Sequence, residues 1–321
     1  MGQFIIRRIV QAIPVIIMLS IIAFAMFHLA PGGPGALYSR DLTIPQTPEE
    51  LARIRHLYGL DRPLPIQYMS WVGGIVEGDL GKSYRNGEPV IELLSRTLGP
   101  TLLLVTTSMV LSLVIAVPIG VLSAVKRYGL FDYLATSIAF FGISIPTFWI
   151  GLMAILVFAV WFRILPTTGM QDLTTTPSVV DTLRHLILPA TVLALPLIGS
   201  WTRFVRSSML EVMSDDYVRT ARAKGLAERT VIFRHALRNS LIPLVTLIGL
   251  TIGYILSSSA IVEYVFAWPG LGQKYIFAAV QDRDYPVLMG ALLLVSVFAL
   301  LGSLVADIGY ALVDPRIRVK D

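Results

Sequence analysis

The sequence contains no cysteine among its 321 residues. That absence excludes disulfide bridges, thiolate metal sites and a cysteine nucleophile. Charged residues are also scarce, at 15% of the chain, where soluble domains carry about 25%. Hydrophobic residues make up 55%, and the mean hydropathy is +0.72. This composition excludes an ordinary soluble protein and predicts a membrane protein with several spans.

Residue patterns that mark catalytic or metal sites are absent as well. The sequence has no nucleophile–base set, no paired carboxylates and no metal-ligand spacing. Gly81-Lys82-Ser83 matches the end of a phosphate-binding loop, but Val76 stands where that loop needs glycine. We therefore expect no catalytic residue, no metal ion and no cofactor on this chain.

Six apolar segments without Asp, Glu, Lys or Arg are long enough, or nearly so, to cross a membrane, which takes about 20 residues. The fold class expected is therefore an all-α membrane protein with six transmembrane helices. The segments are Ile9–Leu29, Thr97–Val125, Tyr133–Phe162, Leu186–Thr202, Asn239–Val262 and Tyr285–Ala306. The apolar run YIFAAV at 275–280 is too short to span and predicts an interfacial helical turn.

Basic residues orient these spans. The gap at 30–96 exceeds about 60 residues and is left out of the positive-inside count. The remaining gaps place 15 Lys and Arg residues on the side of the two termini and 4 on the other side. Both termini are therefore expected in the cytoplasm.

Three domains are expected from this arrangement. Residues 1–96 form an anchor helix and an extracytoplasmic segment, in which Thr47 and Glu50 predict a capping box. Residues 97–313 form the transmembrane domain, with a cytoplasmic loop at 211–240, and residues 314–321 form a cytoplasmic tail.

The most basic stretch lies between the fourth and fifth expected spans. Residues 215–239 read DDYVRTARAKGLAERTVIFRHALRN and include six Arg and Lys residues. Acidic residues followed by good helix formers predict a short helix that ends at Gly225. A second helix is expected after it, and its one side carries Val231, Ile232, His235 and Ala236. Composition alone favours a solvated loop that only sets the topology.

The sequence DDYVRTARAKGL…RHALRNSLIP resembles the cytoplasmic coupling motif, the EAA motif, of ABC importer permeases. It resembles in particular the motif of the B-type subunit of dipeptide and oligopeptide permeases. The resemblance runs in order over nearly the whole chain. It includes GLDRP at 59–63, GDLGKS at 78–83, RSSMLEVM at 206–213, FAWPGLG at 266–272, RDYPV at 283–287 and DPRIR at 314–318. Two departures are RTARAKG, where the general pattern begins Glu-Ala-Ala, and Gly33, where such subunits often have Asp.

This resemblance implies a type I ABC importer permease in a bacterial or archaeal inner membrane. It implies four kinds of partner: a related C-type permease, one or two cytosolic ABC ATPases that hold ATP and Mg²⁺, an extracytoplasmic solute-binding protein, and a peptide as cargo. This chain would be no enzyme itself, and alternating access would follow docking of 215–239 on an ATPase. The residues expected at that contact are Asp216, Arg219, Ala221, Arg222, Ala223, Lys224, Gly225, Leu226, Arg234 and His235.

Polar residues at membrane depth are candidates for a translocation path, although hydroxyls there also join helices together. The candidates for the path are Ser144, Thr147, Ser200, Thr202, Ser257, Ser258 and Ser259. Glu263, Trp268 and Asp307 stand near span ends and are candidates for a gate or an interface.

Two alternatives stay open. Relatives with the same motifs carry nickel chelates, glutathione or oligosaccharides, and the coupling motif does not specify the cargo. A stand-alone secondary transporter is the other alternative, but it would need charged residues inside the spans, and the six segments have none.

Overall fold

The computed structural model describes residues 2–29, 59–172, 178–282 and 284–313, with the single positions 49, 52, 53, 56 and 176. Across these residues the chain is helical, and its β pairing is limited to an isolated bridge between Lys82 and Pro89. The expected capping box, Gly33 and the 314–321 tail lie outside the described residues.

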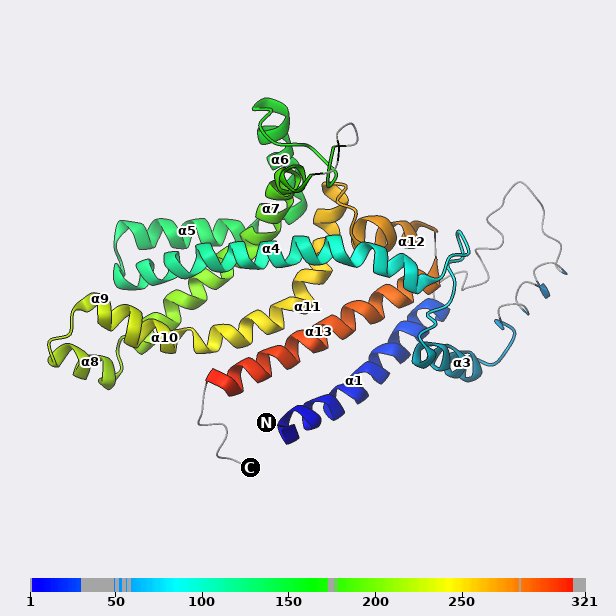
Figure 1. Cartoon of the computed structure of the whole chain (residues 1–321), viewed down its shortest axis with the longest axis horizontal. Helices are drawn as coiled ribbons and strands as arrows, with labels where there is room; N and C mark the ends of the chain where they lie inside the picture. Colours follow the sequence, from blue (N-terminus) through cyan, green and yellow to red (C-terminus); the bar gives the residue numbers. More distant parts are fainter. Residues whose placement is uncertain are drawn as a thin grey trace. The chain divides into compact units, whose positions relative to one another are not determined.

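Five described helices are long and apolar enough to cross a membrane, each where a span was expected. They are α1 (Gly2–Leu29), α4 (Val90–Val125), α7 (Val179–Val212), α11 (Ile242–Val265) and α13 (Tyr285–Val313) (Figure 1). The predicted all-α, multi-span fold is confirmed.

The third expected span is a broken one. α5 (Leu130–Ser144) meets α6 (Thr147–Ala154), which continues as the π-helix η2 (Ile155–Trp161), at a bend of 102°. Ile145 at the break has φ −88° and ψ 133°, because the ring of a following proline, here Pro146, disfavours the helical conformation. The described residues thus contain six candidate spans when this bent pair counts as one.

Several helices extend beyond the predicted spans. α4 starts at Val90 rather than Thr97, and α7 covers Val179–Val212 where hydropathy predicted only Leu186–Thr202. Hydropathy detects the apolar part of a helix, whereas polar turns outside the hydrocarbon layer remain hydrogen-bonded as helix.

The chain divides into two compact units, and the predicted domain boundary at residue 96 remains a prediction. One unit holds residues 101–268 and 299–313. In it, α5 packs so closely on α7 that a Cβ at Gly199 would lie 2.5 Å from the carbonyl oxygen of Ala139. α11 meets α13 in the same way, since a Cβ at Gly249 would lie 2.5 Å from the oxygen of Gly302. Small residues permit these close approaches between membrane helices.

The other unit holds residues 2–100 and 269–298, and includes α3 (Leu64–Glu77), η4 (Gly272–Ile276) and α12 (Phe277–Asp282). The last two confirm the short helical turn predicted at 275–280. A core that includes Leu94, Leu271 and Val287 joins the start of α4 to η4 and α13.

Candidate functional site

Residues 216–240 form a helical hairpin at the end of α7, called here the basic hairpin (Figure 1). Its first arm is α8 (Asp216–Ala223). Its second arm joins α9 (Glu228–Thr230), the π-helix η3 (Val231–Ala236) and α10 (Leu237–Ser240). The prediction of two short helices around Gly225 is confirmed.

The turn between the arms is a Schellman motif. The N–H of Gly225 donates to the oxygen of Arg222 at 2.9 Å, and the N–H of Leu226 donates to that of Ala221 at 3.4 Å. Gly225 has φ +74°, a left-handed conformation that glycine adopts without steric cost. A Cβ at this position would meet no atom within 4 Å, so the outer side of the turn is open.

A small apolar core holds the two arms together. Val218 and Ala221 of α8 pack against Val231 of η3, with Val212 of α7 beside them. Ala221 was expected to let a partner approach, but in this chain its side chain lies inside the hairpin. The core includes the last residue of α7, so the hairpin is packed onto that helix.

An ion pair also joins the arms. Nη2 of Arg222 donates to Oε1 of Glu228 at 2.7 Å, and Nε donates to Oε2 at 3.1 Å. These hydrogen bonds hold the pKa of the Glu228 carboxyl below its ordinary value, because they stabilise its charged form.

Most of the residues expected at an ATPase contact lie on the outside of the hairpin. His235 is half-buried, and Ala221 is buried. The exposed ones are Asp216, Arg219, Arg222, Ala223, Lys224, Gly225, Leu226 and Arg234. Leu226 is 42% exposed and Phe233 is 55% exposed. The outer surface therefore combines cations with apolar side chains, a mixture suited to a protein surface.

The candidate path residues differ in exposure. Ser144, Ser200 and Ser257 are exposed, Thr147 and Ser258 are half-buried, and Thr202 and Ser259 are buried. The hydroxyls of Ser144, Ser257 and Ser258 donate to backbone oxygens of their own helices. Oγ1 of Thr202 is buried and, within the described part of the chain, has no hydrogen-bond partner.

The three gate candidates are placed differently. Glu263 is fully buried, where its Oε1 accepts from the Thr101 hydroxyl at 2.8 Å and the Ser259 hydroxyl at 3.3 Å. Trp268 is fully buried too, rather than at an exposed interface. Asp307 is half-buried on α13.

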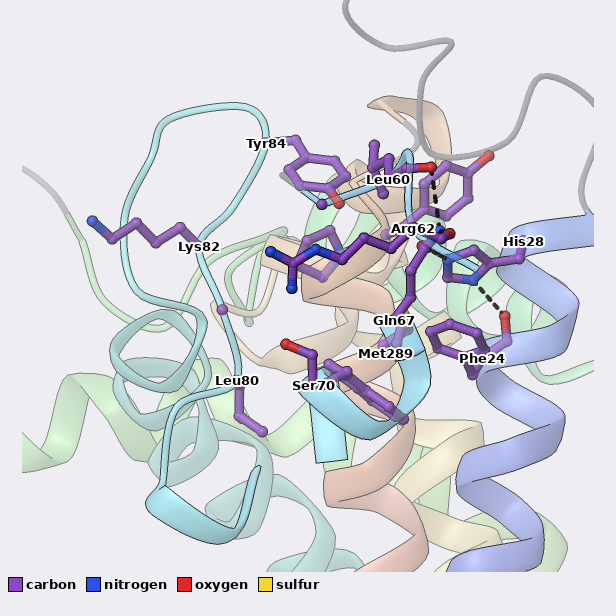
Figure 2. Close-up of a pocket in the computed structure, with 15 residues that line it drawn as sticks. Phe24, His28, Leu60, Arg62, Gln67, Ser70, Leu80, Lys82, Tyr84 and Met289 are labelled. Carbon is purple, nitrogen blue, oxygen red and sulfur yellow. Dashed lines mark hydrogen bonds between the residues drawn. The ribbon is translucent and has the colours of Figure 1, made fainter. Parts of the chain in front are cut away.

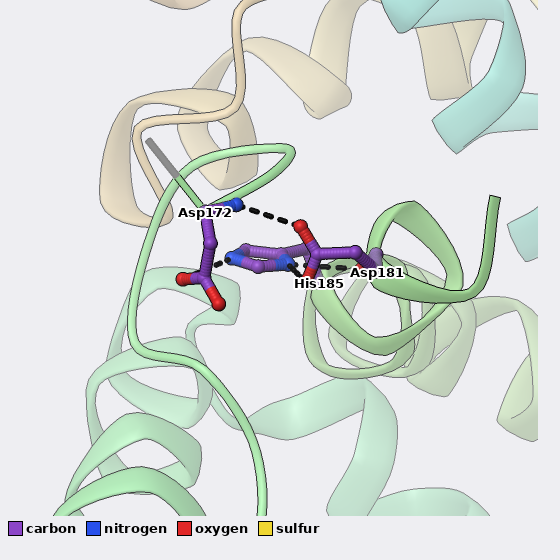
Figure 3. A group of neighbouring side chains, drawn as sticks. All are labelled: Asp172, Asp181 and His185. Carbon is purple, nitrogen blue, oxygen red and sulfur yellow. Dashed lines mark hydrogen bonds and ion pairs between the residues drawn. The ribbon is translucent and has the colours of Figure 1, made fainter. Parts of the chain in front are cut away.

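A histidine between two aspartates was missed by the sequence reasoning. Nδ1 of His185 lies 2.9 Å from the backbone oxygen of Asp181 and 3.3 Å from its Oδ1, and Nε2 lies 3.8 Å from Oδ1 of Asp172. Figure 3 shows the ring between the two carboxylates. One ligand atom from each residue lies within 4.8 Å of the others, the kind of group that holds a metal ion. The i, i+4 spacing of Asp181 and His185 was a signal in the sequence, whereas Asp172 comes from the preceding loop.

A second missed pair ties α5 to α7. Arg206 donates from Nε to Oδ1 of Asp132 at 2.5 Å and from Nη2 to Oδ2 at 2.7 Å. The N–H of Tyr128 donates to the same carboxylate at 2.9 Å. The partners lie 74 residues apart, so no local pattern could have revealed them.

Comparisons with known families match nearly the whole chain. The model described as "Binding-protein-dependent transport system inner membrane component" matches residues 116–319. The model for the N-terminal part of such membrane components matches residues 1–106.

Two curated relatives and one solved structure illustrate the match. The oligopeptide transport system permease protein AppB of Bacillus subtilis is 44% identical over 319 residues, 99% of this chain and 100% of that protein. The dipeptide transport system permease protein DppB of Escherichia coli K12 is 39% identical over 341 residues, 100% of both. An inward-facing structure of the MetNI methionine ABC transporter has a TM-score of 0.59 at 22% identity, over 71% of this chain and 99% of that one. At that identity the likeness shows the fold, which is that of an ABC transporter permease.

Proposed function

Because this chain belongs to the family of binding-protein-dependent transport system inner membrane components, we propose that it is the B-type permease subunit of an ATP-driven importer of di- or oligopeptides. Membership makes the chain a multi-pass inner-membrane subunit of a transport system rather than an enzyme. The proposed cargo is supported by the relatives that transport oligopeptides and dipeptides.

The proposed assembly has three further kinds of protein component. A related C-type permease completes the translocation path, and one or two cytosolic ATPases bind ATP and Mg²⁺ below it. A binding protein delivers the peptide from outside, and segment 30–96 helps to dock it. Both termini lie in the cytoplasm, a placement supported by the excess of basic residues on their side.

In this proposal the basic hairpin is the ATPase contact, and its geometry carries the argument. Exposed cations surround a glycine turn whose outer side is open, so a partner surface can approach the backbone there. The internal core and the Arg222–Glu228 pair keep the two arms together. Closure of the ATPases would therefore move the hairpin and α7 as one rigid body, which is how such an interface switches between two states.

The translocation path is proposed to use the exposed hydroxyls of Ser144, Ser200 and Ser257. These three residues are exposed on this chain. In the assembly, the second permease would form the other side of the path. The unpaired hydroxyl of Thr202 supports a polar contact at that position, since a buried hydroxyl without a partner is costly.

Substitution at Gly225 tests the coupling role. Gly225→Trp should leave membrane insertion intact and abolish peptide uptake, because the indole would occupy the open space that a partner needs. Gly225→Asn is the matched control, since asparagine tolerates a positive φ and is small. Uptake by Gly225→Trp at the wild-type rate, with equal expression, would refute the coupling role.

Co-purification tests the assembly itself. Mild-detergent extraction from the native membrane, followed by mass spectrometry, should recover a second permease and ATPases with Walker motifs. The ATPases should be lost from Gly225→Trp and retained by Gly225→Asn. A chain that purifies alone under every gentle condition would favour the stand-alone transporter.

A further inference from the structure

A cavity of about 250 Å³ lies in the unit formed by residues 2–100 and 269–298 (Figure 2). It is lined by the end of α1, by residues 59–62 and α3, by residues 80–84 and by the start of α13. Three sequence stretches that carried the family resemblance meet here: GLDRP supplies Leu60 and Arg62, GDLGKS supplies Leu80 and Lys82, and RDYPV supplies Tyr285 and Pro286.

The lining of this cavity is positively charged. It includes the two cations Arg62 and Lys82, and no Asp or Glu among its described residues. Arg62 reaches across the view in Figure 2 between Tyr84 and Ser70, whereas the side chain of Lys82 points away from the other lining residues. Within the described part of the chain, neither cationic group makes a direct hydrogen bond or salt bridge, although the charge of Arg62 acts on the carboxyl of the neighbouring Asp61. An unpaired guanidinium in such a lining favours a bound anion.

The hydrogen bonds of His28 hold its ring in the wall of this cavity. Its Nδ1 lies 2.8 Å from the backbone oxygen of Phe24, and its Nε2 lies 3.1 Å from Oε1 of Gln67. The amide nitrogen of Gln67 donates to the oxygens of Leu60 and Arg62, so its amide oxygen is the atom that faces His28. Both ring nitrogens are thus in contact with protein oxygens, which fixes the orientation of the imidazole in the cavity wall.

Apolar surface adjoins the charged lining. Phe24, Trp71 and Met289 form part of the cavity wall. On α3, Leu64 and Ile66 are each 50% exposed and Met69 is 68% exposed, close in sequence to the lining residues Gln67 and Ser70. Helices with exposed apolar side chains next to polar ones lie at membrane surfaces. An occupant of this site would therefore be both anionic and amphiphilic.

We propose that this cavity binds the phosphate group of an anionic phospholipid from the outer leaflet. The planar guanidinium of Arg62 matches two phosphate oxygens, and Lys82 adds a positive charge beside the cavity. The acyl chains lie against the exposed apolar side chains of α3. The site would hold the end of α1, α3 and the start of α13 at the level of the lipid headgroups, and the proposal does not depend on the cargo.

Native mass spectrometry of the full-length chain tests this proposal. Delipidated protein in detergent is titrated with phosphatidylglycerol, with phosphatidylcholine or with inorganic phosphate. We expect one phosphatidylglycerol per chain to be retained in preference to phosphatidylcholine. Arg62→Gln should weaken that binding by about tenfold or more, the effect of losing one strong charge-assisted pair. Arg62→Lys should fall between the two, since it keeps the charge and loses the planar fork.

Arg85→Gln is the matched control. It removes the same charge from the same segment, at an arginine outside the cavity lining that pairs with Asp282 at 3.0 Å. Equal loss in Arg62→Gln and Arg85→Gln would mean general electrostatic attraction and would overturn the site. So would equal retention of phosphatidylcholine, binding of inorganic phosphate without lipid preference, or displacement of the lipid by a short peptide. The last result would make the cavity a cargo site.

Discussion

A single alanine shows how much the local backbone conformation matters. α11 ends in the same turn as α8, with the Trp268 N–H donating to the Glu263 oxygen at 2.8 Å and the Ala267 N–H donating to the Tyr264 oxygen at 3.2 Å. Ala267 occupies the position that Gly225 has in the hairpin, with φ +46°. A left-handed conformation costs an L-residue about 1–2 kcal/mol. The structure does not explain why this position holds alanine rather than glycine.

We therefore predict that Ala267→Gly stabilises the protein by about 1 kcal/mol, because glycine adopts this conformation without a clash. Thermal unfolding of the purified chain in detergent measures the change. Ala267→Val is the opposite control and should unfold at a lower temperature, since branched side chains are least tolerant of positive φ. A lower melting temperature for Ala267→Gly would show that the strain is not there.

These two turns also show the limit of sequence reasoning for single residues. Gly225 was predictable as a helix terminator because glycine after helix formers is a common signal. Ala267 was not, since alanine is a strong helix former and its conformation here comes from the surrounding turn. The same holds for Asp132 and Arg206, whose pairing depends on how α5 packs against α7.

Helices α5 and α7 are joined by one buried ion pair, and we predict that Arg206→Ala costs about 3–5 kcal/mol of stability. The Asp132 carboxylate is only 3% exposed, so the substitution would leave a buried charge without its main partner. Arg203→Ala is the matched control on the same helix, because that arginine is exposed and stacks over Phe140 at 4.3 Å. Denaturation in detergent measures both variants. Equal losses would contradict a dominant role for the pair.

The basic hairpin should respond to acid. The Glu228 pKa is lowered in the folded hairpin, so the stabilisation by the Arg222–Glu228 pair is fully present above the ordinary glutamate value of 4.5. It is lost as the pH falls below that value and through the depressed pKa. Spin labels at Thr220→Cys and Arg229→Cys, one on each arm, should report a broader distance distribution at those pH values. Glu228→Gln should abolish that pH dependence, and persistence of the effect in Glu228→Gln would assign it to another group.

At the scale of the helices, the sequence predicted the position of every span but not the angle of the bend in the third. Hydropathy reports how apolar a segment is, and Tyr133–Phe162 is apolar on both sides of the break. Pro146 marked a place where a helix could be interrupted. The angle of 102°, in contrast, depends on packing that a linear pattern does not contain.

The whole chain offers a direct test of its topology because it has no native cysteine. Each introduced cysteine is therefore a unique label. We predict that Asn86→Cys reacts with a membrane-impermeant maleimide on intact cells, or on spheroplasts where an outer membrane is present. Arg229→Cys should react only after the membrane is permeabilised. Both side chains are exposed, so burial would not explain a difference. The reverse pattern would invert the proposed orientation.

Helix α7 runs without interruption from the Asp172–Asp181–His185 group to the basic hairpin. Its 34 residues correspond to roughly 50 Å at 1.5 Å per residue. Its first turns hold Asp181 and His185 beside Asp172, and its last residue, Val212, packs in the core of the basic hairpin. A rotation of the hairpin must therefore also rotate the opposite end of the helix, unless the helix itself bends. Pro189 and Pro196 lack the backbone N–H groups whose hydrogen bonds stiffen the rest of α7. These two residues therefore determine how much of that rotation is transmitted along the helix.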